Sequence, residues 1–161
     1  MQTPDSMPAI GLIIVGDEIL SGKRQDKHMT KVMELLSARG LSLSHVDYVG
    51  DDPIRLTRTL KRAFEEPGVV FSCGGIGATP DDHTRQSAAN ALGVPLALHP
   101  QAEQLIRERT QDVAREQGLP YEPMREDNIH RLQMGHFPVG AQIIPNPYNK
   151  RSEEHTSELQ S

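Results

Sequence analysis

The chain has 161 residues, a net charge of −5 and a single cysteine, and 36% of its residues are hydrophobic. This length suffices for one domain with its own core, and the hydrophobic content is that of a globular protein. The acidic balance argues against nucleic acid as the main partner, because binding to a phosphate backbone needs a basic face. One cysteine excludes an internal disulfide. No apolar run is long enough to span a bilayer, and the first residues do not form a secretory signal, so we expect a cytoplasmic protein.

Strands and helices alternate along the first part of the chain. Residues 9–15 form a continuous, Ile-rich apolar run, which is typical of a strand buried on both faces. Apolar residues at helical spacing predict a helix over 27–39, and Gly40 is placed to end it. A second strand is predicted over 41–49. The segment 16–22 between the first strand and the first helix is predicted to be a loop.

The same alternation continues beyond residue 50. Asp52 and Pro53 predict a helix start, because Asp is a good N-cap and Pro suits the first helical position. This helix is expected to end near Pro67. A third buried strand over 69–73 and a helix over 84–92 follow. The later elements expected are helices over 101–117 and 124–132 and a strand over 140–144.

This order of elements predicts βαβ units within one domain over residues 1–150. The fold class expected is α/β, with three layers in which helices cover both faces of a largely parallel sheet. The last eleven residues, 151–161, read like the translation of a sequencing-library adapter. We therefore expect that they are an artefact and that the natural protein continues past Lys150. The alternative is a disordered natural tail.

Three segments are expected at the carboxyl ends of the parallel strands, which is where such sheets bind ligands. They are residues 16–22, 50–52 and 74–82, and each contains both Gly and Asp. The last of these is the strongest local signal. Its glycines Gly74, Gly75 and Gly77 allow positive φ and close approach to a ligand, and their amides can bind an anion in front of the next helix. A tight strand-to-helix turn explains the glycines equally well.

The glycine loop matches neither of two common phosphate-binding motifs. No Gly-Lys-Ser/Thr sequence closes it, and Pro80 stands where the third glycine of a dinucleotide fingerprint belongs. Ser21-Gly22-Lys23 has the composition of such a closing sequence, but its spacing from Gly16 is wrong.

Carboxylates follow all three strands. Asp81 and Asp82 come after a loop suited to anions. Their carboxylates would repel a phosphate bound there unless Mg²⁺ bridged carboxylate and phosphate. One of the two aspartates is expected to cap the next helix, which leaves the other for the ligand. The same reasoning leaves Asp51 free beside the capping Asp52. Asp17 and Glu18 either bind a ligand or stay solvated. Cys73 is interpreted as a structural thiol, because no partner activates it, and the histidines as surface or capping residues.

Together these motifs resemble the MoaB/Mog-type molybdopterin-binding domain, and within it the N-terminal domain of the CinA family (competence/damage-inducible protein A). The resemblance covers most of residues 10–150. It rests on three segments: Gly16-Asp17-Glu18-Ile19-Leu20-Ser21-Gly22, Val49-Gly50-Asp51-Asp52, and Gly74-Gly75-Ile76-Gly77 with Asp81-Asp82-His83-Thr84. Ile76, Ala78 and Lys27-His28 depart from the usual family pattern.

The resemblance implies the three-layer fold and assigns roles by position. Asp51 and Asp82 would be the catalytic and metal-binding carboxylates, with Mg²⁺ as the metal, and Asp81 occupies a variable family position. The residues implied to contact the molybdopterin or nucleotide are Gly74, Gly75, Gly77, Asp17, Glu18 and Thr84. The family's later loop, which closes the pocket, would begin at residues 137–147 and continue past Lys150.

Three functions stay open at this point. The first is molybdopterin binding in molybdenum cofactor biosynthesis, because relatives adenylylate the pterin phosphate with Mg-ATP. The second is a metal-dependent pyrophosphatase acting on ADP-ribose, to which the N-terminal domains of the CinA family are linked. The third is a non-catalytic small-molecule-binding module. In each case the partner is a phosphate-bearing small molecule, without nucleic acid or membrane. The sequence does not decide between a monomer and a homo-oligomer, nor whether the chain is a nucleotidyltransferase, a pyrophosphatase or no enzyme.

Overall fold

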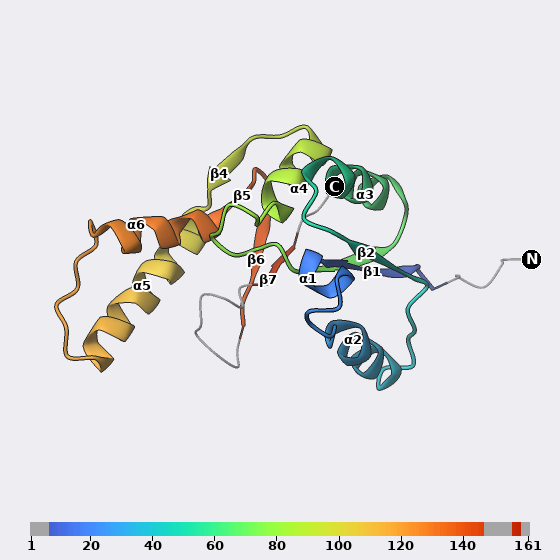
Figure 1. Cartoon of the computed structure of the whole chain (residues 1–161), viewed down its shortest axis with the longest axis horizontal. Coiled ribbons are helices and arrows are strands. Elements are labelled where there is room, and N and C mark those ends of the chain that lie inside the picture. Colours follow the sequence, from blue (N-terminus) through green and yellow to red (C-terminus); the bar gives the residue numbers. More distant parts are fainter. Residues whose placement is uncertain (1–6, 147–155, 159–161) are drawn as a thin grey trace, which may run out of the picture.

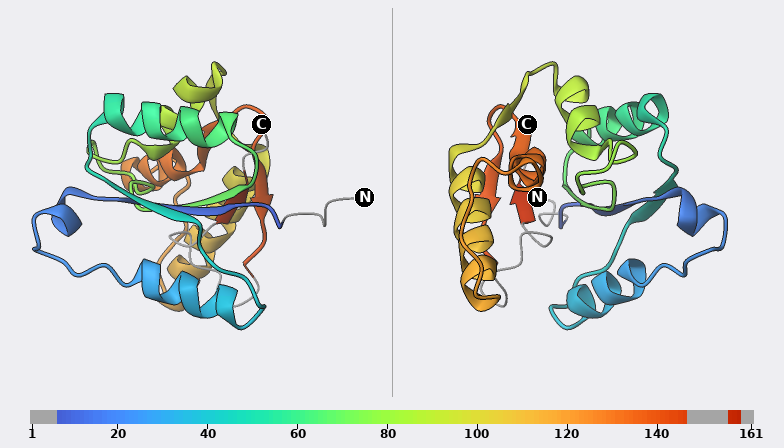
Figure 2. Two further views of the ribbon diagram at one scale, coloured as in Figure 1. Left: turned by 90° about the vertical axis from the view of Figure 1, so that its right-hand side faces the viewer. Right: turned by 60° about the vertical axis from the view of Figure 1, so that its left-hand side comes forward.

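The structure is a computed structural model that describes residues 7–146 and 156–158. Its elements form two lobes, which Figure 1 and the right view of Figure 2 set apart. The sheet lobe contains β1 (Ile10–Val15), α1 (Asp17–Leu20), α2 (His28–Ser37), β2 (His45–Val49), α3 (Pro53–Glu65), β3 (Val69–Cys73) and α4 (Thr84–Leu92). The second lobe contains β4 (Leu96–Leu98), α5 (Pro100–Glu116), α6 (Glu126–Arg131), the 3₁₀ helix η1 (Leu132–Gly135), β5 (His136–Pro138), β6 (Gln142–Ile144) and β7 (Thr156–Glu158).

The sheet lobe is built on three parallel strands in the order β2-β1-β3. Every residue of the central strand β1 is buried, as its apolar run predicts. The register places Ile14 opposite Tyr48 on one side and Cys73 on the other. The carboxyl ends of all three strands therefore lie side by side, and the segments that follow the strands meet there.

Helices cover both faces of this sheet and give the expected three layers. In the left view of Figure 2, α2 lies on one face and α3 on the other. The main core cluster joins the sheet to α3 and α4 and consists of Ile13, Val15, Val49, Leu56, Leu60 and Ala88. Burial of a side chain such as Leu56, which is 0% exposed, stabilises the fold by about 1.5–3 kcal/mol. The predicted fold class is confirmed.

Two aspartates fix where the helices beside the sheet begin. The Asp52 carboxylate accepts hydrogen bonds from the amides of Ile54 at 2.9 Å and Arg55 at 3.3 Å, and Pro53 occupies the first turn, as predicted. Asp26 does the same for α2 through the amides of His28 and Met29. Both carboxylates satisfy donors that would otherwise have no partner within the helix.

Three local predictions in the sheet lobe are wrong. Strand β3 is not buried on both faces, since it lies at an edge of the sheet, and Val69 and Phe71 are 48% and 45% exposed. Strand β2 begins at His45 instead of Leu41, because only from there does it pair with β1. The segment 16–22 is not simply a loop, because it contains the short helix α1.

The second lobe departs further from the expected order. The strand predicted over 140–144 exists as β6, but it pairs antiparallel with β7 in a separate sheet and does not join the parallel one. Strands β4 and β5 were not predicted; they form another antiparallel pair. Strand β7 lies within residues 151–161, and the adapter origin of that segment stays a prediction. A second core cluster holds this lobe together and consists of Ala102, Phe137, Ala141 and Ile143.

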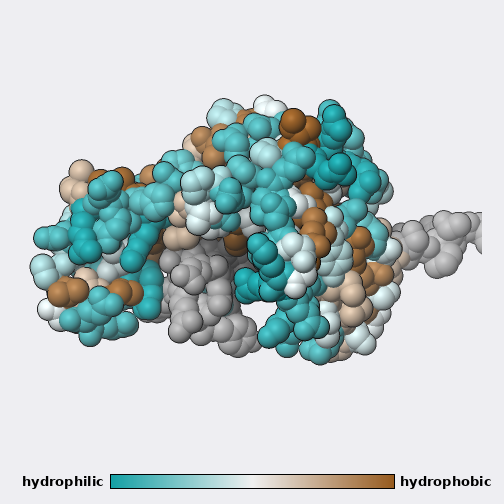
Figure 3. Space-filling view, in the orientation of Figure 1, coloured by the Kyte–Doolittle hydropathy of each residue, from teal (hydrophilic) through white to brown (hydrophobic). Residues whose placement is uncertain are grey.

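The face shown in Figure 3 is mostly hydrophilic, with hydrophobic residues in small, separate groups. Among the described residues, no helix is long and apolar enough to cross a membrane.

Candidate functional site

A pocket of about 320 Å³ lies where the three parallel strands end. It is formed by residues that follow β1, β2 and β3, so the topology of the sheet brings distant parts of the chain together there. Its lining residues are Val15, Gly16, Glu18, Asp51, Gly74, Gly75, Thr79, Asp81 and Asp82. This position agrees with the general location of ligand sites in open parallel sheets.

The segments after β1 and β2 are tied to each other by their aspartates. The amide of Asp51 donates to Oδ1 of Asp17 at 2.9 Å, and the amide of Asp17 donates to Oδ2 of Asp51 at 3.2 Å. A Cβ on Gly50 would lie 2.5 Å from Asp17 Oδ1, so the close approach of the two segments requires glycine there. Asp17 thus has a structural role, whereas Asp51 is held in a fixed orientation at the pocket wall.

The glycine loop after β3 takes the strained backbone that its sequence predicts. Gly74 and Gly75 have φ values of 94° and 65°, and a Cβ on Gly74 would lie 2.1 Å from the carbonyl oxygen of Val15. Thr84, which is 7% exposed, stabilises this turn through two hydrogen bonds. Its hydroxyl donates to the Gly74 carbonyl at 2.8 Å and its amide donates to the Gly75 carbonyl at 3.1 Å. Thr84 therefore shapes the loop and does not line the pocket.

Asp82 folds the end of the loop back on itself. Its Oδ2 accepts from the amide of Thr79 at 2.9 Å and from the Thr79 hydroxyl at 2.6 Å. Burial raises the pKa of the Asp82 carboxyl, but hydrogen bonds from Thr79 and Gly77 and the charge of Arg85 outweigh this and lower the pKa below its ordinary value. Asp82 is accordingly ionised at neutral pH.

A second pocket of about 330 Å³ adjoins the first on the side of the second lobe. Thr79 and Asp82 line both pockets and form the wall between them. Arg85 also lines the second pocket, and its guanidinium donates to the carbonyls of Ile76, Gly77 and Gln133. Sequence reasoning missed Arg85, although its place in the first turn of the helix after the glycine loop was a signal for it.

The structure brings most of the predicted site residues to one pocket. Of the predicted set, Glu18, Asp51, Gly74, Gly75 and Asp82 line the first pocket. Three others do not: Asp17 and Thr84 support the loops from behind, and Gly77 lines the second pocket. Thr79 was not predicted, and Asp81, assigned to a variable family position, lines the pocket with Asp82.

The side chains of the pocket are of the type that binds a hard cation, but they do not by themselves form a complete set of metal ligands. Glu18, Asp51, Asp81 and Asp82 all line it, and carboxylate oxygens are the ligands that Mg²⁺ prefers. Within residues 7–146, no three His, Cys, Asp or Glu side chains come close enough together to hold a metal ion. A cation bound here would need one or two of these carboxylates together with oxygens of a ligand or water.

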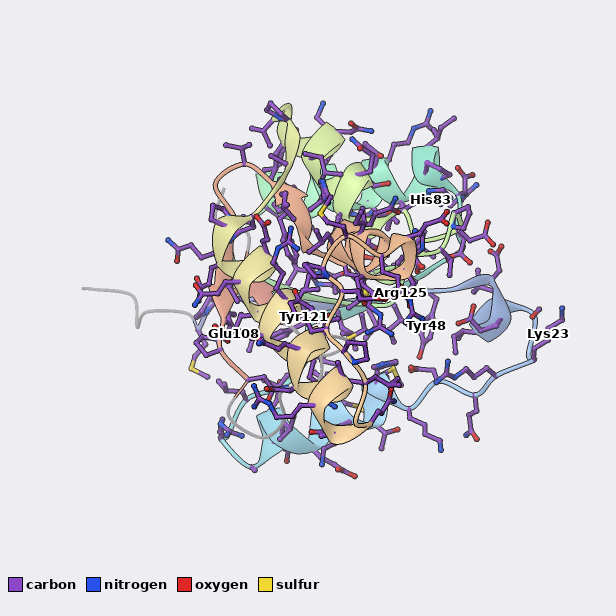
Figure 4. The ribbon with its side chains drawn as sticks, turned by 90° about the vertical axis from the view of Figure 1, so that its left-hand side faces the viewer. Lys23, Tyr48, His83, Glu108, Tyr121 and Arg125 are labelled. Atoms are coloured by element: carbon purple, nitrogen blue, oxygen red, sulfur yellow. The ribbon has the colours of Figure 1, made fainter. Side chains whose placement is uncertain are left out.

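Cys73 and Lys23 agree with their interpretation from the sequence. Burial raises the pKa of the Cys73 thiol, and the charge of Asp26 adds to this, so the thiol is protonated and unreactive at neutral pH. Lys23 lies at the outer bend of the connection between α1 and α2 and points away from the molecule in Figure 4. The Ser21-Gly22-Lys23 sequence therefore does not act as a phosphate-binding lysine motif.

Comparisons with known proteins agree on one family. The family described as a probable molybdopterin binding domain matches residues 11–146. A CinA-like protein from Gloeobacter violaceus is 33% identical over 140 residues, which cover 87% of this chain and 30% of that protein. A CinA-like protein from an Anaeromyxobacter species is 32% identical over 139 residues, 86% of this chain and 32% of that protein. This chain thus spans about a third of the length of these curated relatives.

One solved structure supports the fold over most of the chain. The crystal structure of the protein CinA with unknown function from Thermoplasma acidophilum has a TM-score of 0.68 and 25% sequence identity. The match covers 89% of this chain and 78% of that protein. The three-layer architecture described above is therefore shared with a protein that carries the same family name as the sequence relatives.

Proposed function

Since the chain belongs to the family of probable molybdopterin binding domains, we propose that it binds a phosphate-bearing small molecule of the molybdopterin or nucleotide class in the pocket at the ends of β1, β2 and β3. The observation that carries this proposal is the composition of that pocket. Three glycines with positive φ, Gly16, Gly74 and Gly75, line it together with carboxylates from all three segments that follow the strands. The glycine backbone allows a ligand to approach closely, and the ends of parallel strands are where such a ligand is expected.

The charge of the pocket defines what the ligand must bring with it. The side chains that line it include four carboxylates and, among the described residues, no Lys, Arg or His. An anionic phosphate is repelled by this lining unless a cation accompanies it. We therefore propose that the phosphate binds together with Mg²⁺, with Asp51 and Asp82 as the protein ligands.

Both carboxylates are prepared for this role by their hydrogen bonds. The amide of Asp17 orients Asp51, and Thr79 orients Asp82, so neither side chain has to be ordered when the ligand arrives. The lowered pKa of Asp82 keeps this carboxyl charged at neutral pH. Mg²⁺ bound between carboxylate and phosphate would neutralise the charge that develops when a phosphate bond is made or broken.

The alternative function is a metal-dependent pyrophosphatase acting on ADP-ribose. It would use the same carboxylates, and it would also need a general base to activate water. Asp82 is a poor base, because its pKa lies below its ordinary value. Binding is thus better supported than hydrolysis. A cytoplasmic location is part of the same proposal, and a chain whose single cysteine cannot form an internal disulfide is compatible with it.

Isothermal titration calorimetry with molybdopterin and with ADP-ribose, each with and without Mg²⁺, tests the proposal. Saturable binding that requires Mg²⁺ is the expected result. Analysis of the ADP-ribose sample after the titration separates the two functions, because AMP and ribose 5-phosphate accumulate only if the chain hydrolyses its ligand. Absence of binding for both compounds would refute the proposal.

A further inference from the structure

Charged side chains hold the glycine loop from two sides. Asp82 accepts from the amide and the hydroxyl of Thr79, whereas Arg85 donates to the carbonyls of Ile76 and Gly77, the latter at 2.7 Å. The N–H and C=O groups of successive peptide units are thus bound by opposite charges. Because the Asp82 carboxylate only accepts hydrogen bonds and the Arg85 guanidinium only donates them, this pairing fixes the direction in which the loop amides point.

Arg85 also connects this loop to the other lobe. Its second terminal nitrogen donates to the Gln133 carbonyl in η1 at 3.3 Å, and its guanidinium carbon lies 6.0 Å from the centre of the Phe137 ring in β5. The side chain is half-buried in the wall of the second pocket. One residue therefore contacts the glycine loop, η1 and β5 together.

We propose that Arg85 is a positioning residue, which holds the glycine loop in its ligand-binding conformation and couples that conformation to the contact between the two lobes. The inference rests on the proposed function for its effect on binding, but its effect on the loop does not depend on any ligand. Arg85 itself lies behind the loop, and it does not line the first pocket.

The hydrogen-bond geometry of the guanidinium distinguishes the positioning role of Arg85 from an effect of its charge alone. The planar guanidinium presents donors in fixed directions and can bond several carbonyls at once. Lysine keeps the charge and nearly the length, but its ammonium acts as a point charge and cannot reproduce the fork. Arg85→Lys therefore keeps the electrostatics near Asp82 and removes the bridge between Gly77 and Gln133.

Amide hydrogen exchange measured by NMR on the ligand-free protein provides the first test. In the Arg85→Lys variant, we expect the amide hydrogens of Gly77 and Thr79 to exchange about tenfold faster than in the parent. This factor corresponds to a decrease of ~1.4 kcal/mol in the free energy of local opening. Exchange in β1 should be unchanged. The matched control is Arg58→Lys, at an exposed arginine of α3, which should change neither region. Arg85→Gln, which also loses the charge, should show a larger local effect; if this variant does not fold, Arg85→Lys carries the test.

Calorimetric titration of the same variants with ADP-ribose and Mg²⁺ provides the second test, in which Arg85→Lys should bind about tenfold more weakly. Unchanged exchange at Gly77 and Thr79 would overturn the inference, and so would faster exchange that extends equally to β1. If the parent binds no ADP-ribose while the loop amides of Arg85→Lys exchange faster, the inference stands and the choice of ligand in the proposed function fails.

Discussion

Replacement of Gly74 by alanine is expected to destabilise the protein far more than the same change at a glycine with a similar backbone but open surroundings. Gly74 has a φ of 94°, and a Cβ there would lie 2.1 Å from the carbonyl oxygen of Val15 in the central strand. Gly22 has a φ of 76°, and a Cβ there would meet nothing within 4 Å. The two positions share the strain of a positive φ and differ in the clash.

The magnitudes follow from these two contributions. Alanine in a left-handed conformation costs about 1–2 kcal/mol, of which about 0.5–1 kcal/mol is offset because alanine loses less conformational freedom on folding. Gly22→Ala should therefore lower the free energy of unfolding by about 1 kcal/mol or less. Gly74→Ala adds the cost of moving the backbone of β1 or β3, about 1–3 kcal/mol, so a total loss of about 1–4 kcal/mol is expected, larger than that of Gly22→Ala by the cost of the clash.

Urea unfolding followed by circular dichroism measures both variants against the parent. Equal m-values would show that the comparison concerns the folded state. If Gly74→Ala were no less stable than Gly22→Ala, the glycine loop would not lie against β1 as described, and the pocket wall built on it would be wrong.

Three further predictions concern two side chains around the glycine loop and the cap of α3. Thr84→Val should lower the free energy of unfolding by about 1–2 kcal/mol, because it leaves the Gly74 carbonyl without its partner, whereas Thr84→Ser should stay close to the parent in the same urea assay. Because the pKa of Asp82 lies below its ordinary value of 3.8, its ionised form contributes stability above that pH and loses it as the pH falls through the lower, folded-state pKa. Asp82→Asn should therefore be less stable than the parent at pH 7, with a difference that shrinks towards pH 2; a constant difference in urea unfolding would contradict this. Asp52→Ala should cost about 1 kcal/mol through loss of the α3 cap, and Asp52→Asn much less, in thermal or urea unfolding.

The sequence predicted the elements that are determined by residues close to each other in the chain. Asp52 and Pro53 mark the start of α3 because capping needs only neighbouring residues. The apolar run of β1 likewise predicts a central strand. The family assignment from the motifs is confirmed by the match over residues 11–146 and by the CinA-like relatives.

The features that the sequence did not predict depend on contacts between distant residues. The exposure of Phe71 follows from the place of β3 at the edge of the sheet, which no pattern within β3 records. Strands β4 and β5 have only three residues each, too few for an alternating pattern. The place of Arg85 in the first turn of α4 can be read from the sequence, but its role cannot, because that role depends on which carbonyls lie around it, Gln133 among them.

The central claim is a metal-assisted phosphate site held by Asp51 and Asp82, and one calorimetric titration with ADP-ribose and Mg²⁺ tests it most directly. The parent, Asp51→Asn and Asp52→Asn form a matched set, because Asp51 lines the pocket and Asp52 instead caps α3, a role that asparagine also fills. The account predicts that the parent and Asp52→Asn bind equally and only with Mg²⁺, and that Asp51→Asn binds at least tenfold more weakly, a loss of ~1.4 kcal/mol or more. Equal, Mg²⁺-dependent binding by all three proteins would contradict the role of Asp51, and binding that does not depend on Mg²⁺ would contradict the metal.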